Sequence, residues 1–138
     1  TRSGTAPVKA AARGETTISV SFVHDVTTEA VNGFPVGSVT PSEGTGAEVG
    51  SMSIVKNGPN TEAAKKFYEW ALTPGGQQFG LAAKQFQLPS NTQVPKDPRM
   101  TDPSKMKLIN YDYAKYGASA ERRRLIARWE KEVQNAAR

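Results

Sequence analysis

A loop rich in glycine, hydroxyl and carboxylate groups is the feature of this sequence with the clearest chemical meaning. Its members are Glu43, Gly44, Thr45, Gly46 and Glu48. The two glycines permit the positive φ angles that open a concave backbone with accessible N–H groups. The threonine and the two glutamates add a hydroxyl and two carboxylates. This combination predicts a wall that binds a small polar ligand; a loop that only turns the chain is the alternative.

A histidine–aspartate pair could contact the same ligand. His24 is the only histidine of the chain and precedes Asp25. The β-branched and aromatic residues 17–23 predict a strand before the pair, and α/β folds bind ligands at the carboxyl ends of parallel strands. An N-capping Asp25 beside a partly buried His24 is the structural alternative. A hydrolase that uses His24 as a base is a weaker interpretation, because adjacent residues do not by default form an oriented dyad.

A third group of polar side chains lies at the predicted start of the first helix. Ser3 or Thr5 can cap a helix that carries Pro7 in its first turn and ends at Gly14. The free N–H groups at such a start, together with the helix dipole, favour an anion. Helix capping alone explains the same residue types, so both interpretations stay open.

Several other chemistries have no support in the sequence. It has no cysteine, and it contains no dinucleotide fingerprint, phosphate loop, H-E-x-x-H or G-x-S-x-G motif. A single histidine argues against a zinc site. A hard cation could use Asp25, Glu43 and Glu48, although their spacing does not demand one. We therefore expect neither an enzyme nor a bound metal or cofactor.

Positive charge is concentrated in the C-terminal part. The chain has 18 basic and 13 acidic residues, of which residues 99–138 hold 10 and 5. Four arginines dominate one predicted helix: Arg122, Arg123, Arg124 and Arg128. A solvated helix face is the simpler interpretation, and a basic face for nucleic acid is the alternative.

Three tyrosines near Asp112 could in principle supply phenolates to ferric iron. They are Tyr111, Tyr113 and Tyr116. At this spacing, a half-buried turn before a helix is the simpler interpretation.

The elements that must position these groups alternate between strand and helix in the first half of the chain. Further strands are predicted over 34–39 and 48–55, with a short helix over 27–31. The 138 residues suffice for one domain, and no apolar run approaches the length of a membrane span. We expect an α/β fold with a small, mostly parallel sheet, flanking helices and a helical C-terminal part. So small a sheet indicates part of a larger protein.

The second half of the chain is predicted to be mainly helical. Asn60 or Thr61 can cap a helix with an apolar stripe at 3- and 4-residue spacing, and a shorter helix follows through Ala83. The last helix should span about residues 119–135. Its expected buried stripe is Leu125, Ile126, Trp129 and Val133.

Five segments follow one another in an order typical of one family. They are Thr-Arg-Ser-Gly-Thr-Ala-Pro (1–7), Val-Ser-Phe-Val-His-Asp (20–25), Glu-Gly-Thr-Gly-Ala-Glu-Val-Gly-Ser-Met-Ser-Ile-Val (43–55), Ala-Lys-Lys-Phe-Tyr-Glu-Trp-Ala-Leu-Thr-Pro (64–74) and Leu-Pro-Ser-Asn (88–91). Together they resemble the C-terminal half of an extracellular solute-binding protein of an ABC importer. The branch is usually described as ferric-iron binding and includes sugar-phosphate binders.

The resemblance implies part of a type 2 periplasmic-binding-protein fold, in which two α/β lobes close on a ligand. Residues 1–47 would belong to the second lobe, residues 48–57 would form the crossing strand, and residues 58–138 would return to the first lobe. The chain begins without methionine or a signal peptide. We therefore expect a mature form, or an excised or engineered piece without the N-terminal half.

The resemblance also implies the ligand contacts. The expected ligand-binding residues are Ser3, Thr5, His24, Asp25, Glu43, Thr45, Gly46 and Glu48. In sugar-phosphate binders a His-Asp pair and a later glutamate hold sugar hydroxyls; His24 and Asp25 match the pair, Glu48 is the first choice for the glutamate and Glu43 the second. The adjacent tyrosine pair of ferric-iron binders is not found here, which favours a polyhydroxylated or phosphorylated ligand.

We therefore expect the substrate-binding component of an ABC importer. It would be secreted to the periplasm, dock on a membrane permease, and close on a sugar phosphate, phosphate or ferric complex, with no nucleic acid as partner. A ferric-iron-binding protein of the same fold is the first alternative, and a nucleic-acid module acting through the C-terminal helix is the second. A fragment of such a fold exposes apolar faces and unpaired edges, so we expect a homodimer, for example one with exchanged elements, and weak ligand affinity.

Overall fold

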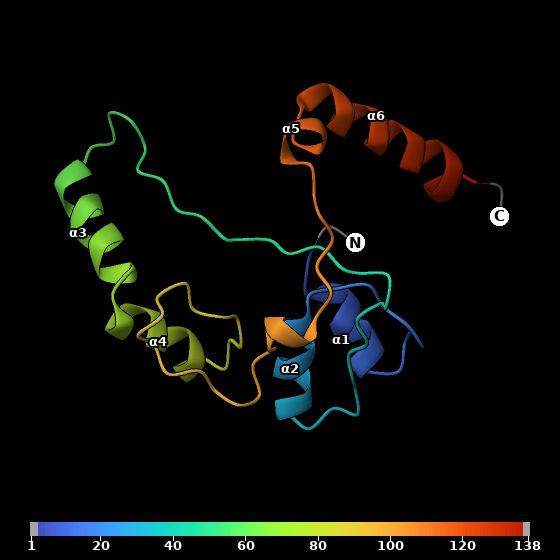
Figure 1. The fold of residues 1–138 in the computed structure, drawn as a ribbon, viewed down its shortest axis with the longest axis horizontal. Helices are drawn as coiled ribbons and strands as arrows, with labels where there is room; N and C mark the ends of the chain where they lie inside the picture. Colours follow the sequence, from blue (N-terminus) through green and yellow to red (C-terminus); the bar gives the residue numbers. More distant parts are fainter. Residues whose placement is uncertain (1–2, 137–138) are drawn as a thin grey trace. The chain divides into compact units, whose positions relative to one another are not determined.

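The computed structural model describes residues 3–136; residues 1–2 and 137–138, at the ends of the expected ranges 1–47 and 58–138, lie outside this part. Its helices are α1 (Ala6–Ala12), α2 (Val23–Val31), α3 (Thr61–Ala71), α4 (Pro74–Ala82), the 3-10 turn η1 (Pro103–Lys105), α5 (Tyr113–Tyr116), α6 (Ser119–Trp129) and the π-helical turn η2 (Glu130–Gln134) (Figure 1). The chain divides into two compact units. Unit 1 comprises residues up to 40 and residues 48–106, and unit 2 comprises residues 41–47 and 107–138.

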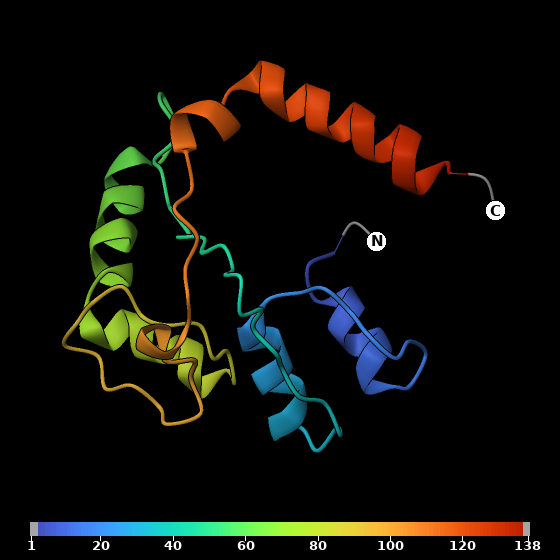
Figure 2. The ribbon, with the colours of Figure 1, turned by 45° about the vertical axis from the view of Figure 1, so that its right-hand side comes forward.

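The first helix of unit 1 forms as its sequence predicts. Thr5 stands at the N-cap, Pro7 occupies the first turn, and Gly14 follows the end with a φ of 74°. The Thr5 side chain accepts no capping hydrogen bond, so the helix start depends mainly on proline geometry. Val8 and Ala12, one turn apart, are buried, and α1 packs beside α2 (Figure 2).

The second helix begins four residues earlier than expected, and the prediction of a strand over 17–23 is wrong. Phe22 is the N-cap in an extended conformation, and Val23 already begins α2. Asn32 and Gly33, the latter with a φ of 93°, end the helix as predicted. Residues 17–22 remain an extended loop, because a strand needs a neighbouring strand to pair with and the described chain offers none there.

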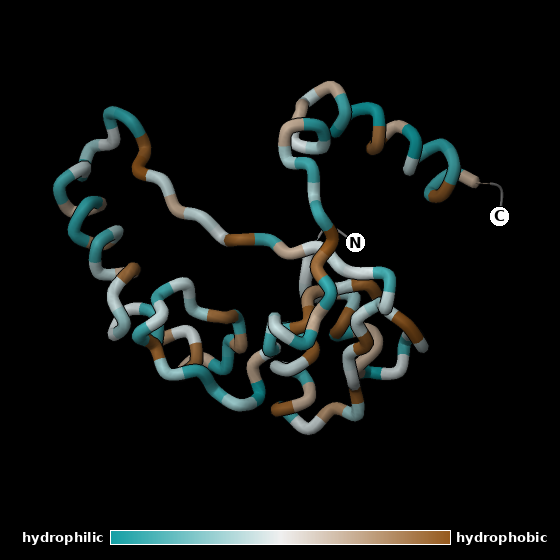
Figure 3. The backbone as a smooth tube through the Cα atoms, in the orientation of Figure 1, coloured by the Kyte–Doolittle hydropathy of each residue, from teal (hydrophilic) through white to brown (hydrophobic). Residues whose placement is uncertain are grey.

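The small parallel sheet expected from the sequence is likewise not formed within residues 3–136. Residues 34–39 and 48–55 run in extended loops, and the one bridge seen there is a parallel pair between Thr45 and Leu108. Apolar side chains in the extended segments stay in solvent, with Val20 92% and Val39 94% exposed. Apolar stretches accordingly recur along the loops as well as the helices (Figure 3). An extended segment becomes a strand only when a second one pairs with it, and these segments meet none in the described chain.

The helices α3 and α4 confirm the predicted helical pair. Asn60 precedes α3, and the Thr73 hydroxyl caps α4 by accepting a bond from the Gly76 N–H at 3.1 Å. The two helices pack together through the ring of Trp70, whose centroid lies 5.6 Å from that of Phe67 and 5.7 Å from that of Phe79. All three rings remain substantially exposed, so this pair has little core of its own.

The core of unit 1 is small. Its buried apolar side chains are Val8, Ala12, Phe86 and Val94. Phe86 lies after α4, just beyond Lys84, which adopts a φ of 57° and turns the chain back. Further along, Asn91 fixes the loop: its side-chain amide donates to the Leu72 carbonyl at 2.9 Å, and its side-chain oxygen accepts from the Gln93 N–H at 3.0 Å.

Unit 2 is helical but has no buried side chain among its described residues. Asp112 caps α5 by accepting from the Lys115 N–H at 2.9 Å. The predicted last helix exists as α6 continued by η2. Its expected buried stripe of Leu125, Ile126, Trp129 and Val133 is exposed instead, and the described elements that contact α6 are its sequence neighbours α5 and η2. Among the described residues, no helix has the length and apolar character that crossing a bilayer requires.

Candidate functional site

The His24–Asp25 pair lies in the first turn of α2. The His24 side chain is 23% exposed and that of Asp25 is 9% exposed, and His24 Nε2 lies 3.6 Å from Asp25 Oδ1. The N-cap is Phe22, so the structural alternative of an N-capping Asp25 is wrong, while the partly buried histidine is confirmed. Asp25 still benefits from its place near the positive end of the helix dipole. A sheltered imidazole beside a carboxylate can both donate and accept hydrogen bonds.

An aromatic side chain connects this pair with the start of the chain. The Phe22 ring stacks on the His24 ring with centroids 5.4 Å apart and an interplanar angle of 17°. Gly4 lies directly against Phe22, because a Cβ at Gly4 would come within 3.2 Å of the ring. The Ser21 hydroxyl donates to the Gly4 carbonyl at 2.8 Å and holds the two segments together.

The predicted residues Ser3 and Thr5 therefore lie in the neighbourhood of His24. They flank Gly4, and their hydroxyl oxygens are 3.3 Å apart. Both residues are exposed. The structure thus connects Gly4, which Ser3 and Thr5 flank, to His24 through the ring of Phe22, a residue with no role predicted from the sequence.

The glycine-rich loop belongs to unit 2 in its first part. Thr45 forms the parallel bridge: its N–H donates to the Lys107 carbonyl at 2.9 Å, and its carbonyl accepts from the Ile109 N–H at 3.0 Å. Gly44 has a φ of 124°, and a Cβ there would come within 2.9 Å of the Ile109 side chain. The prediction of a glycine-dependent turn is confirmed at Gly44. It is wrong at Gly46, which does not adopt a positive φ and has open space around it.

The two candidate glutamates are both exposed. Glu43 accepts a bond from the neighbouring Ser42 hydroxyl at 3.3 Å. Glu48 is the first residue of the chain on its return to unit 1 and makes no hydrogen bond or ion pair with the described residues.

One further polar residue next to His24 was missed by the sequence analysis. The side-chain amide nitrogen of Gln87 lies 3.2 Å from His24 Nε2 across 63 residues of sequence. A glutamine in a polar loop gives no pattern from which such a contact can be predicted. Its only sequence signal is Phe86 beside it, an aromatic residue in an otherwise polar segment.

An ion pair supports the loop that carries Gln87. Arg99 makes two side-chain hydrogen bonds to Asp97, at 2.8 and 2.7 Å, and its guanidinium lies 4.9 Å from the centroid of the Phe86 ring. The hydrogen bonds from Arg99 lower the pKa of Asp97 from 3.8 to about 2. Asp97, Arg99 and Phe86 thus form a continuous contact beside the loop.

We expect acid to weaken unit 1 through Asp97. A carboxyl with a lowered pKa contributes stability above its ordinary value of 3.8, and that contribution is lost as pH falls towards about 2. Urea unfolding of the wild type should therefore lose stability between about pH 4 and pH 2 more steeply than that of Asp97→Asn. Glu62→Gln, at an exposed carboxylate on α3, serves as the control. Equal slopes for wild type and Asp97→Asn would contradict this role.

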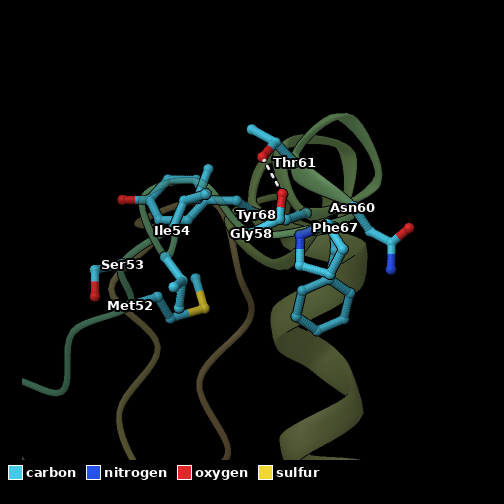
Figure 4. Close-up of a pocket in the computed structure, with 11 residues that line it drawn as sticks. Met52, Ser53, Ile54, Gly58, Asn60, Thr61, Phe67 and Tyr68 are labelled. Atoms are coloured by element: carbon cyan, nitrogen blue, oxygen red, sulfur yellow. Dashed lines mark hydrogen bonds between the residues drawn. The ribbon is translucent and has the colours of Figure 1, made fainter.

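A separate cavity of about 460 Å³ lies in unit 1 between the extended segment before Gly58 and the start of α3 (Figure 4). Met52, Ile54 and Phe67 give it an apolar wall, and the Thr61 hydroxyl, which could bind a ligand, already donates to the Gly58 carbonyl at 2.9 Å. None of the predicted ligand-binding residues lines it. Its chemistry does not suit a sugar phosphate.

The features behind the alternative functions are also visible. Tyr111 contacts Tyr113 and Tyr116, with ring centroids 5.0 and 5.3 Å apart. On the last helix, Arg124 pairs with Glu121 at 2.6 Å and Arg128 with Glu132 at 2.8 Å. Glu121 and Glu132 thus partly neutralise the positive charge of this helix. Within residues 3–136, no three His, Asp or Glu side chains gather in a way that could hold a metal ion.

Residues 4–116 match the family described as bacterial extracellular solute-binding protein. The chain belongs to this family, whose members bind solutes and do not catalyse reactions. The resemblance stated from the sequence is therefore confirmed.

Two solved structures share the fold. The periplasmic binding protein AfuA from Actinobacillus pleuropneumoniae, solved with exogenous fructose-6-phosphate bound, superposes with a TM-score of 0.89 at 44% identity over 99% of this chain and 43% of its own. The periplasmic binding protein P5PA gives a TM-score of 0.75 at 33% identity over 91% of this chain and 40% of its own. They confirm a partial periplasmic-binding-protein fold.

A relative in Haemophilus influenzae is 48% identical over 139 residues, which are 99% of this chain and 40% of that protein. The present chain thus spans about two fifths of the length of the proteins it matches.

Proposed function

We propose that this chain is part of the periplasmic substrate-binding component of an ABC importer, and that its solute is a sugar phosphate such as fructose-6-phosphate. The observation that carries the proposal is the 44% identity and TM-score of 0.89 with AfuA, a protein solved with that sugar phosphate. The polar, sheltered surroundings of His24 and Asp25 support it. The complete protein would deliver the solute to a membrane permease.

The proposed contacts follow the residues already named. His24 and Asp25 would hold sugar hydroxyls, and Ser3 and Thr5 would offer hydroxyl groups beside them. Glu48 is preferred to Glu43 because it makes no hydrogen bond or ion pair with the described residues, whereas Glu43 bonds to Ser42. Thr45 and Gly46 would offer backbone groups. The two-lobe assignment, with residues 1–47 in one lobe, 48–57 crossing and 58–138 in the other, remains part of this proposal.

A titration with fructose-6-phosphate followed by nuclear magnetic resonance tests the function. With only two fifths of the relatives' length, we expect a dissociation constant of about 1 mM or weaker, equivalent to about −4.1 kcal/mol. Signals of residues 24, 25 and 48 should move with fructose-6-phosphate and less with fructose or inorganic phosphate. Glu48→Gln should reduce these changes more than Glu43→Gln.

The control for the glutamate variants is Glu62→Gln, which alters an exposed carboxylate on α3. Ferric citrate is titrated in the same way. Resonance changes seen only with ferric citrate would favour the ferric-iron-binding alternative. Equal changes for fructose-6-phosphate and inorganic phosphate would contradict recognition of the sugar, and no change at His24 would contradict the site.

We also propose that residues 1–138 associate as a homodimer. Ile18 and Val20 are more than four-fifths exposed in an extended segment that has no strand partner in the described chain, and such edges favour pairing with another chain. Light scattering at micromolar concentration should give twice the chain mass of 14.9 kDa. Val20→Lys should shift the mass towards the monomer, and Thr17→Lys, on the opposite face, should not. A wild-type mass of 14.9 kDa would contradict the dimer.

A further inference from the structure

The segment that follows α4 lies along one face of α2. Two positions of that helix and its C-cap, each one turn after the last, contact it: His24, Thr28 and Asn32. The Thr28 hydroxyl donates to the Lys84 carbonyl at 3.0 Å, and the Lys84 ammonium donates to the Asn32 side-chain oxygen at 3.4 Å. Residues four apart share a helix face. These contacts fix the register of the segment against the helix and thereby set where Gln87 lies.

Phe86, a residue of the same segment, anchors it in the core of unit 1. It is 2% exposed and belongs to the small core of unit 1. Arg99 covers its ring and is itself held by Asp97. Gln87 is thus an exposed side chain whose backbone follows directly after a buried anchor.

The contact between Gln87 and His24 has a defined polarity. The amide nitrogen of Gln87 is a donor only, and it lies 3.2 Å from His24 Nε2. The contact is a hydrogen bond only when the imidazole nitrogen accepts, that is, when the neutral ring carries its proton on Nδ1. Asp25 Oδ1, 3.6 Å from the same Nε2, is the group that would favour a proton there if Gln87 were absent. The hydrogen bond made by one ring nitrogen sets the state of the other.

We propose that Gln87 is a positioning residue that orients the His24 ring and selects its Nδ1–H tautomer, so that His24 meets the solute as a donor through Nδ1. This inference rests on the proposed function for the role of His24, but the tautomer itself is a property of the unliganded chain. The Phe22 ring lies stacked on the His24 imidazole and limits how far the imidazole can tilt.

Because His24 is the only histidine, the nitrogen resonances of its ring can be assigned without ambiguity. The experiment records long-range proton–nitrogen spectra of the unliganded chain at an alkaline pH, where the imidazole ring is neutral. We expect the Nδ1–H form in the wild type. In Gln87→Ala the proton should move to Nε2, beside Asp25, and in Gln87→Glu it should do the same, because a carboxylate only accepts.

The matched control is Gln85→Ala, which removes an exposed glutamine two residues away whose backbone N–H, not its side chain, makes the local bond to Gly80. It should keep the wild-type tautomer. Fructose-6-phosphate affinity should fall about three- to tenfold in Gln87→Ala and remain unchanged in Gln85→Ala.

The possible outcomes separate the two proposals. An Nε2–H ring in the wild type, or the same tautomer in the wild type and Gln87→Ala, would overturn the positioning role. A tautomer change in Gln87→Ala, in a chain whose wild type shows no response to fructose-6-phosphate, would support the positioning role while contradicting the proposed solute.

Discussion

Replacing Phe86 with alanine should cost about 3–5 kcal/mol of unfolding free energy, the largest stability effect that we expect from any single change in unit 1. Phe86 is 2% exposed and is the largest of the four buried apolar side chains of this unit. Its removal would leave a cavity and release the Arg99 side chain from its ring. Domains are commonly stable by only about 5–15 kcal/mol, so the variant should unfold at much lower urea.

Phe79→Ala is the matched control for this change. The Phe79 ring is 63% exposed and makes one tilted contact with Trp70, so its removal should cost about 0.5–1.5 kcal/mol at most. Phe86→Leu should retain most of the stability because it keeps the site filled. Equal urea midpoints for Phe86→Ala and Phe79→Ala would show that the buried ring is not an anchor.

The helices could be predicted from the sequence because their signals are local. Pro7 and Gly14 bracket α1, and Asn60 precedes α3, so these bounds follow from residues close to each end. The strands could not be predicted in the same way. Residues 17–23 have strand composition, yet a strand depends on a distant partner, and the described chain provides only the Thr45–Leu108 bridge.

The candidate site shows the same division between local and distant information. The His-Asp pair stands out because it is a local motif, although its place in the first turn of α2 was not predicted. Phe22 and Gln87, by contrast, act through contacts across the fold: a stacked ring against Gly4 and an amide brought from 63 residues away. No spacing rule connects residue 87 with residue 24.

The exposed apolar stripe of α6 has a related cause. Its period correctly predicted an amphipathic helix, but periodicity says which face is apolar and not what covers it. In unit 2 the stripe stays exposed, with only the sequence neighbours α5 and η2 in contact with α6, just as Val20 and Val39 in unit 1 stay in solvent. A chain that spans two fifths of its relatives can thus keep its helices while its faces and edges lack partners.

Asp25→Asn should have the largest effect on solute binding. The carboxylate is 9% exposed, in the first turn of a helix, and beside His24, so it can form charge-assisted hydrogen bonds to sugar hydroxyls that an amide oxygen only partly replaces. Loss of such a bond costs about 1.5–3 kcal/mol, which is about a ten- to hundredfold loss of affinity. Fructose-6-phosphate binding, weak in the wild-type chain, should then fall below detection by isothermal titration.

Glu29→Gln provides the control for this change, because it neutralises another buried carboxylate on the same helix, one turn further on. It should leave binding unchanged even if it lowers stability. His24→Ala should resemble Asp25→Asn in binding, since the two side chains would hold the sugar together. Equal affinities in Asp25→Asn and Glu29→Gln would mean that α2 contributes only its fold to the protein, and that the solute is recognised by other residues.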